Sequence, residues 1–214
     1  MRRHWKGVAG FGVVVAACAL AGCTVALAPP INTTGASAAA SSRASTGLVV
    51  ANGHGWTSAG LEGPVPASGT CHLRYTSNGE PLPDPACTPG AIDSAVTQAN
   101  LPTTVCRKGG YTSTVRPPET ITEPFKKKIM AAYGIPWSKA SSYELDHLVE
   151  LAIGGASDTR NLWPEPNTFK TATPSQYVHN DKDQAEQTAF SNLCSGKATL
   201  AHVQTQMAND WTGI

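Results

Sequence analysis

The sequence predicts an α+β fold with a single modest core, and three observations support this prediction. Glycine (20 residues) and proline (16) are frequent among the 214 residues, whereas only 14% of residues are charged and 7% are aromatic. Coiled coils and helical bundles contain more charged residues and fewer helix breakers, so neither class fits. Hydrophobic spacing in the second half of the chain changes between strand-like and helical periods. After the N-terminal segments described below are set aside, roughly 150 to 165 residues remain to form the core.

Residues 1–22 have the features of an export signal. The segment Met1–Lys6 is basic, and an uncharged apolar run follows from Gly7 to Ala21. A transmembrane helix needs about 20 apolar residues, so this shorter run favours a signal peptide. The run ends in Leu-Ala-Gly-Cys at 20–23, which resembles the bacterial lipobox, whose cysteine is lipidated. We therefore expect a lipid anchor on Cys23; an ordinary secretory signal with an incidental cysteine is the alternative.

The charge excludes one class of protein. The whole chain has a net charge of +1, from 16 Lys and Arg against 15 Asp and Glu. Removal of Arg2, Arg3 and Lys6 with the signal leaves 13 against 15, a net charge of −2. Proteins that coat nucleic acid are strongly basic, because phosphate neutralisation supplies their affinity. Such a coat protein is excluded, but an enzyme of nucleic acids with a small basic site is not.

Three further regions follow the signal. Residues 23–46 are mainly Ala, Ser, Thr, Gly and Pro, which cannot bury enough surface to offset the entropy cost of ordering. We expect them to form a flexible tether. Residues 47–106 are rich in turn formers and are expected to form a loop-rich extension, in which 48–50 and 95–97 could be short strands or a helical turn. Residues 107–214 are expected to form the domain that carries the chemistry.

Four cysteines remain in the exported chain if Cys23 carries lipid: Cys71, Cys87, Cys106 and Cys194. An even number outside the cytoplasm predicts two disulfides, for which three connectivities are possible. No pair has the two-residue spacing of a zinc knuckle. We favour Cys71–Cys87 as a local loop closure and Cys106–Cys194 as a long-range link, which closes a loop of about 88 residues and could contribute several kcal/mol.

Hydrophobic spacing from residue 122 onward predicts the order of the later elements. A helix is expected after Thr122, a suitable N-cap, and Gly134 is expected to stop it. The remaining elements are expected in this order: a strand over 143–151, the glycine pair Gly154-Gly155, a second strand over 161–164, a helix over 180–193 and a helix over 200–211.

One stretch in this region combines residues that hydrolytic chemistry needs. It contains, in order, Asp146-His147, Gly154-Gly155, Asn161-Leu162-Trp163-Pro164 and His179-Asn180-Asp181-Lys182. Hydrolysis of a phosphodiester needs a base that activates water and a cation that neutralises developing charge. His147 suits the base, since imidazole titrates near neutrality, and Asp146 offers the hard oxygen that Mg²⁺ prefers. Neighbours on a regular strand point to opposite sides, so both reach one site only if the strand ends or twists there.

With its motifs in this order and at this spacing, the stretch resembles the HNH (His-Me finger) nuclease family. The flanking segments Cys87–Ala91, Val115–Pro118, Tyr143–His147 and Cys194–Gly196 resemble more closely those of secreted actinobacterial HNH-domain proteins, over roughly residues 84–211. The resemblance implies a ββα-metal core, in which a β-hairpin and a helix hold one divalent ion. It implies that His147 is the base, that Asn161 orients His147 and braces the hairpin, and that Asp146 is a metal ligand.

The resemblance leaves the second protein ligand of the metal open. The order His-Asn-x-Lys favours His179, whereas a register on Lys182-Asp183 gives Asn180 or Asp183 instead. The interval from Asn161 to His179 is longer than the compact family spacing, which implies an inserted loop at 165–177. Arg160 and Lys182 are candidates for phosphate contact, and solvated surface is the alternative for each.

The sequence thus predicts a metal-dependent endonuclease that lies outside the cytoplasm, either lipid-anchored at the cell membrane or secreted. DNA is favoured over RNA as the substrate, with little sequence preference. Mg²⁺ is the favoured cofactor, with Mn²⁺, Zn²⁺ or Ca²⁺ as alternatives; we expect no small-molecule cofactor and a monomeric chain. The main alternative is a non-catalytic cell-envelope lipoprotein that uses the scaffold as a binding or structural module, because a fold does not fix a function.

Overall fold

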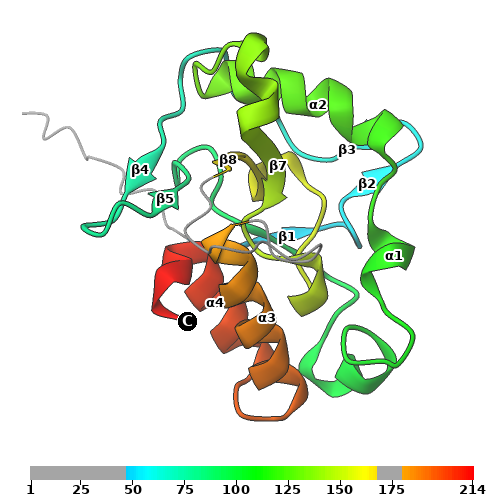
Figure 1. Cartoon of the computed structure of the whole chain (residues 1–214). Coiled ribbons are helices and arrows are strands. Elements are labelled where there is room, and N and C mark those ends of the chain that lie inside the picture. Colours follow the sequence, from blue (N-terminus) through cyan, green and yellow to red (C-terminus); the bar gives the residue numbers. More distant parts are fainter. Residues whose placement is uncertain (1–46, 168–179) are drawn as a thin grey trace, which may run out of the picture. The chain divides into compact units, whose positions relative to one another are not determined.

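The structure is a computed structural model of the chain, and it describes residues 47–167 and 180–214 (Figure 1). The predicted signal peptide, Cys23, the tether, most of the predicted 165–177 insertion and His179 lie outside the described residues. Within the described ranges, no helix combines the length and the apolar character that a membrane crossing would require.

The described residues form α-helices and small two-stranded sheets, which confirms the α+β prediction in this coarse form. The strands are β1 (Val49–Ala51), β2 (Trp56–Thr57), β3 (Gly60–Leu61), β4 (Arg74–Tyr75), β5 (Pro81–Leu82), β6 (Ala91–Asp93), β7 (Tyr143–His147) and β8 (Leu162–Pro166). The helices are α1 (Thr112–Val115), α2 (Glu119–Ala132), α3 (Asp181–Cys194) and α4 (Leu200–Asp210). Short 3₁₀ turns cover Gln98–Thr103, Trp137–Ser142, Leu151–Ile153, Thr159–Asn161 and Trp211–Gly213. β1 pairs with β6 in parallel, and the pairs β2–β3, β4–β5 and β7–β8 are antiparallel.

Helix α2 begins at Glu119, earlier than the predicted N-cap Thr122, and the reason is the proline pair before it. A residue that precedes proline is pushed out of the helical region, so Pro117 cannot belong to the helix. Pro118 is then the N-cap, with extended backbone at φ −68° and ψ 156°. The carboxylate of Glu119 lies in the first turn, where it complements the helix dipole. As predicted, the helix stops before Gly134, whose φ is +68°.

Strand β7 ends at His147, four residues before the predicted end at Leu151, because the chain turns sharply there. The β7–β8 register pairs Tyr143 with Pro166 and His147 with Leu162. A side chain at Gly155 would place its Cβ 1.8 Å from the Val149 carbonyl oxygen, so only glycine permits this turn. The predicted second strand is present as β8, which runs two residues beyond the predicted end.

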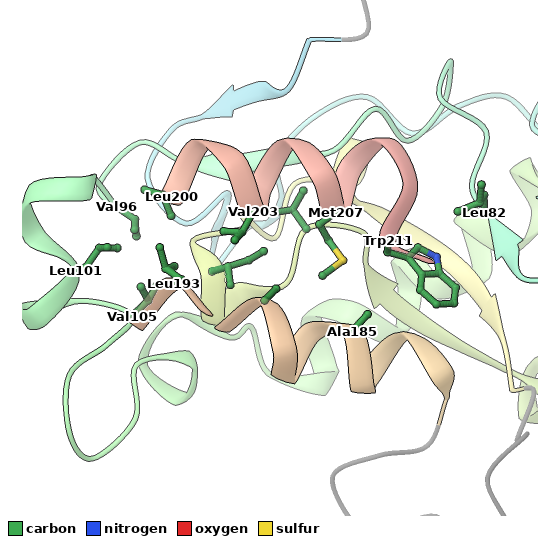
Figure 2. Packing of buried hydrophobic residues seen from close by; sticks show 13 residues of the cluster. Leu82, Val96, Leu101, Val105, Ala185, Leu193, Leu200, Val203, Met207 and Trp211 are labelled. Carbon is green, nitrogen blue, oxygen red and sulfur yellow. The ribbon is translucent and has the colours of Figure 1, made fainter. Parts of the chain in front are cut away.

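The predicted helices over 180–193 and 200–211 are confirmed as α3 and α4, which pack on each other through one apolar face each (Figure 2). Their buried residues recur at helical spacing: Ala185, Ala189 and Leu193 on α3, and Leu200, Val203 and Met207 on α4. Leu82, Val96, Leu101 and Val105 add side chains from the N-terminal extension to this core (Figure 2). The extension and the two C-terminal helices therefore share one hydrophobic core.

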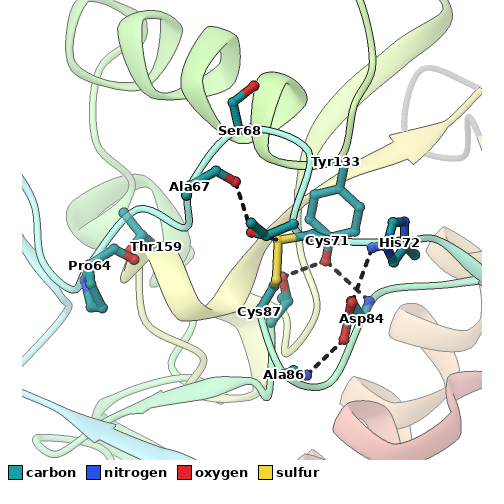
Figure 3. Close-up of a disulfide and its surroundings, with 12 residues drawn as sticks. Pro64, Ala67, Ser68, Cys71, His72, Asp84, Ala86, Cys87, Tyr133 and Thr159 are labelled. Carbon is teal, nitrogen blue, oxygen red and sulfur yellow. Dashed lines mark hydrogen bonds between the residues drawn. A yellow bond between two sulfur atoms is a disulfide. The ribbon is translucent and has the colours of Figure 1, made fainter.

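Both favoured disulfide pairings are present. Cys71 and Cys87 are bonded with a Cα–Cα distance of 6.0 Å, and Cys106 and Cys194 with 5.4 Å. The first disulfide lies beside the end of α2, where the Tyr133 hydroxyl accepts from the Asp84 backbone at 3.1 Å and lies 2.8 Å from the Thr88 hydroxyl (Figure 3). The second ties the extension to the last residue of α3.

Segment 154–160, which leads into β8, is held between two parts of the N-terminal extension by backbone hydrogen bonds. Ser157 N–H donates to the His54 carbonyl at 2.8 Å, and Thr159 N–H donates to the Glu62 carbonyl at 2.8 Å. On the other side, Ala156 N–H donates to the Ala91 carbonyl at 3.0 Å. The described residues all belong to one compact unit, and the extension is part of the framework around the hairpin.

Candidate functional site

Asp146 and His147 close β7, and the structure gives their side chains different partners. The Asp146 carboxylate accepts from Trp163 Nε1 at 2.9 Å and lies 2.7 Å from the Lys182 ammonium of α3. His147 lies with its Nε2 3.0 Å from Ser157 Oγ. His147 also lines a hollow of about 210 Å³ together with Arg116 and residues of α2. The strand stays regular up to His147, so the two side chains keep the opposite directions of a regular strand.

The environment of His147 keeps its imidazole neutral. The side chain is 7% exposed. Burial, together with the charges of Arg116 and Lys182, lowers the pKa of His147 to about 3. At physiological pH the ring therefore has one N–H and one free lone pair, and the contact with Ser157 fixes which way the ring faces.

Asn161 braces the chain between the two strands. Its Oδ1 accepts from Val149 N–H at 2.9 Å, and its Nδ2 donates to the carbonyls of Val149 at 2.9 Å and Ala156 at 2.8 Å. Its own carbonyl accepts from Leu148 N–H at 2.8 Å. The side chain is fully buried and bonds to the backbone rather than to His147. Asn161 thus holds the loop that follows β7, and its orientation of His147 stays a prediction.

The two candidates for phosphate contact are both occupied by internal carboxylates. Arg160 donates from Nε and Nη2 to the Asp158 carboxylate at 2.8 and 2.6 Å. Lys182 is 1% exposed, donates to the His147 carbonyl at 2.9 Å, and pairs with Asp146 and Glu186. Lys182 is therefore enclosed and not accessible to a phosphate in the structure, whereas the Arg160 side chain is 34% exposed and its phosphate contact stays a prediction. The i,i+4 spacing of Lys182 and Glu186 was a signal for such a pair in the sequence.

A cluster of carboxyl groups surrounds the Lys182 ammonium. Burial alone would lower the pKa of Lys182, but the nearby carboxylates hold it well above its usual range. Burial raises the pKa of Glu150 to about 7, and it raises the pKa values of Glu165 and Glu186 well above their usual range. The Glu150 Oε2 atom is enclosed and has no hydrogen-bond partner among the described residues. The buried carboxyl groups between the hairpin and α3 are therefore shifted towards their protonated, neutral forms.

The donor chemistry of this cluster fits a hard divalent cation, although its ligands do not converge in the structure. Asp146 and the other carboxyl groups offer hard oxygens, and a bound cation would favour their ionised forms. Among residues 47–167 and 180–214, however, no three His, Cys, Asp or Glu side chains lie close enough together to hold a metal ion.

Asn180, a candidate for the second ligand, serves as the N-cap of α3. Its backbone N–H donates to the Asp183 carboxylate at 2.8 Å in a capping box, and its side-chain amide donates to the Glu144 carboxylate. Asp183, the other described candidate, is the reciprocal partner in this capping box. His179 is outside the described residues.

Two residues of the site were not found by sequence reasoning. Ser157 contacts His147 because segment 154–160 folds back on β7, and no short-range pattern encodes that contact. Arg116 belongs to the flanking segment Val115–Pro118 and was given no role from the sequence; its exposed guanidinium lines the hollow beside His147 and has no hydrogen-bond or ion-pair partner among the described residues. Comparisons with known proteins gave no match to a family model, a curated protein or a solved structure.

Proposed function

We propose that the protein is a metal-dependent endonuclease of the HNH type that hydrolyses phosphodiester bonds outside the cytoplasm. One observation carries this proposal: a neutral, oriented imidazole opens onto the same hollow as a guanidinium that is exposed and unpaired among residues 47–167 and 180–214. An imidazole can take a proton from water, and a guanidinium binds a phosphate. The order of hairpin β7–β8 and helix α3 supports the ββα-metal core that the sequence resemblance implies.

In this proposal each residue has a separate task. Ser157 accepts the Nε2 proton of His147, which leaves Nδ1 free to take a proton from the attacking water. Arg116 draws the phosphodiester into the hollow, and Asn161 keeps the loop after β7 in place. Asp146 is the residue proposed to hold the divalent ion, which would supply positive charge to the departing oxygen. Since the Asp146 side chain lies on the α3 side of β7, paired with Lys182, it must turn towards the His147 hollow for this task.

The proposed location rests on the disulfides and on the predicted signal. Two disulfides are expected in an oxidising compartment and are compatible with a place outside the cytoplasm. The lipid anchor on Cys23 is part of the proposal. Radiolabelled fatty acid should be incorporated into the parent chain and not into Cys23→Ser; equal labelling would contradict the anchor.

A plasmid-nicking assay with the purified chain tests the enzymatic proposal. The parent should nick DNA with Mg²⁺ and stop when EDTA is added. His147→Ala should lower the rate by about 10²- to 10⁴-fold, because a general base is lost. The matched control is His202→Ala, at an exposed position of α4, which should nick like the parent. Absence of cleavage of both plasmid and single-stranded DNA by the folded parent with Mg²⁺, Mn²⁺, Zn²⁺ or Ca²⁺ would favour the non-catalytic envelope protein instead.

A further inference from the structure

The hollow that contains His147 continues along α2 into a second hollow of about 320 Å³. Three residues line both hollows: Glu119, Thr122 and Leu145. Along α2 the wall is a single helix face, since its residues lie three or four positions apart: Glu119, Thr122, Glu123 and Lys126. The opposite wall is the turn Trp137–Ser142, and β7 forms the floor through Leu145. We call this continuous depression the α2 groove.

The far end of the α2 groove contains an exposed indole. Trp137 is 40% exposed, whereas Trp163 and Trp211 are 0% and 3% exposed and belong to the core. Core packing therefore does not account for the position of Trp137. A flat aromatic side chain on the wall of a groove is the feature on which unpaired bases stack, and this stacking is independent of base identity.

The α2 groove contains charges of both signs. The exposed Arg116 guanidinium lies at the His147 end and has no hydrogen-bond or ion-pair partner among the described residues. Glu119 lines both hollows, and towards Trp137 the wall adds the Glu123 carboxylate and the Lys126 ammonium, which donates to the Ala140 carbonyl at 3.1 Å. Because the Trp137 end adds one charge of each sign, the Arg116 guanidinium is the favoured place for a phosphate. The carboxylates disfavour phosphates, but they can accept hydrogen bonds from the exocyclic amines of bases.

We propose that the α2 groove binds a single strand of nucleic acid, with one phosphodiester at Arg116 and His147 and an unpaired base against Trp137. This inference rests on the proposed nuclease function and assigns its substrate class. A duplex keeps its bases stacked inside, so no base face can reach Trp137 unless the strand is unpaired. Hollows of about 210 and 320 Å³ are large enough to hold single chemical groups such as a phosphate or a base.

Binding by fluorescence anisotropy tests the inference without cleavage. The probes are a labelled 12-nucleotide single strand and the duplex of the same sequence, in EDTA, with intact probe confirmed afterwards. The parent should bind the single strand more tightly than the duplex. Trp137→Ala should weaken single-strand binding by about 5- to 150-fold, and Trp137→Phe should retain most of it. Arg116→Gln should lower the salt dependence by about one phosphate contact.

The matched control is Tyr75→Ala, which removes an aromatic side chain that is 60% exposed on β4 and outside the groove. It should bind like the parent. Equal single-strand affinity of Trp137→Ala and the parent, tighter binding of the duplex, or no binding of either probe by the folded chain overturns the inference.

The outcomes separate this inference from the nuclease proposal. In one outcome, single-strand binding depends on Trp137 but no metal supports cleavage of plasmid or single-stranded DNA. The α2 groove would then bind single strands in a protein that is not a nuclease. In the other outcome, the parent nicks DNA in a metal-dependent manner but Trp137→Ala binds the single strand as tightly as the parent. The nuclease proposal would then stand, and the α2 groove would not be the binding site of the strand.

Discussion

The Nε2 atom of His147 lies 3.0 Å from the Oγ atom of Ser157, and both side chains are buried. The two residues are ten positions apart and belong to the end of β7 and to the segment that returns to β8. Backbone hydrogen bonds to His54 and Ala91 hold that segment in place on both sides of Ser157. The orientation of the imidazole thus depends on a contact that the N-terminal extension supports.

Ser157→Ala should reduce activity through the orientation of His147. Because Ser157 is buried and does not line the α2 groove, we expect kcat to fall, by up to about 100-fold, with KM nearly unchanged. The ¹⁵N chemical shifts of the His147 ring should also change, which a purely structural defect elsewhere would not cause. Ser195→Ala, at an exposed position after α3, is the control. Unchanged kcat and unchanged ring shifts would remove Ser157 from the mechanism.

Lys182→Met should destabilise the fold strongly. The substitution keeps most of the side-chain volume but leaves the carboxylates of Asp146 and Glu186 without their cation. Removal of one partner of a buried ion pair costs about 3–5 kcal/mol. Urea unfolding should show this loss, and Lys197→Met, at an exposed position, should unfold like the parent. A loss below about 1 kcal/mol, the range of an exposed ion pair, would contradict a buried pair.

The Glu150 carboxyl should make stability depend on pH. Its pKa is raised to about 7 in the folded protein, against an unfolded value of 4.5, so its contribution is fully present below pH 4.5 and is lost as pH rises to 7. Glu150→Gln removes this loss. The variant should match the parent at pH 4.5 and be more stable by about 1–3 kcal/mol at pH 8.

The measurement is the difference in unfolding free energy between parent and Glu150→Gln across this range, because the difference cancels the titration of all other groups. Glu123→Gln, which removes one carboxyl group from the exposed face of α2, is the matched control for the loss of a single negative charge. If the difference in unfolding free energy between Glu150→Gln and the parent were the same at all pH values, ionisation of Glu150 would not be its cause.

The two disulfides should contribute unequally. Cys106–Cys194 closes a separation of 88 residues and Cys71–Cys87 one of 16. In the chain-entropy model, the longer loop should contribute about 1.5 kcal/mol more. Replacement of each pair by serine, followed by thermal unfolding, should lower Tm further for the Cys106–Cys194 pair. The reverse order would show that packing around Cys71, which is fully buried, outweighs loop entropy.

Local patterns in the sequence predicted the elements that one short segment can specify. The spacing of Ala185, Ala189 and Leu193 predicted α3, and the number of cysteines predicted two disulfides. The end of β7 was predicted too late because the turn after His147 is imposed by the Asn161 amide, twelve residues beyond Val149. The placement of Lys182 was missed for a similar reason, since its partners Asp146 and the His147 carbonyl lie on β7, far earlier in the chain.

Segment 154–160 is held by backbone partners about 100 residues earlier in the chain, and Lys182 reaches the hairpin from α3. A chain with so many long-range contacts folds slowly, because distant segments must meet before their contacts stabilise the structure. A ribosome-bound chain that lacks α3 has neither the Lys182 contact nor the cysteine partner of Cys106. The proposed site is therefore latent during synthesis and is completed only when the last quarter of the chain has emerged, which would protect the nucleic acid of the cell that makes the protein.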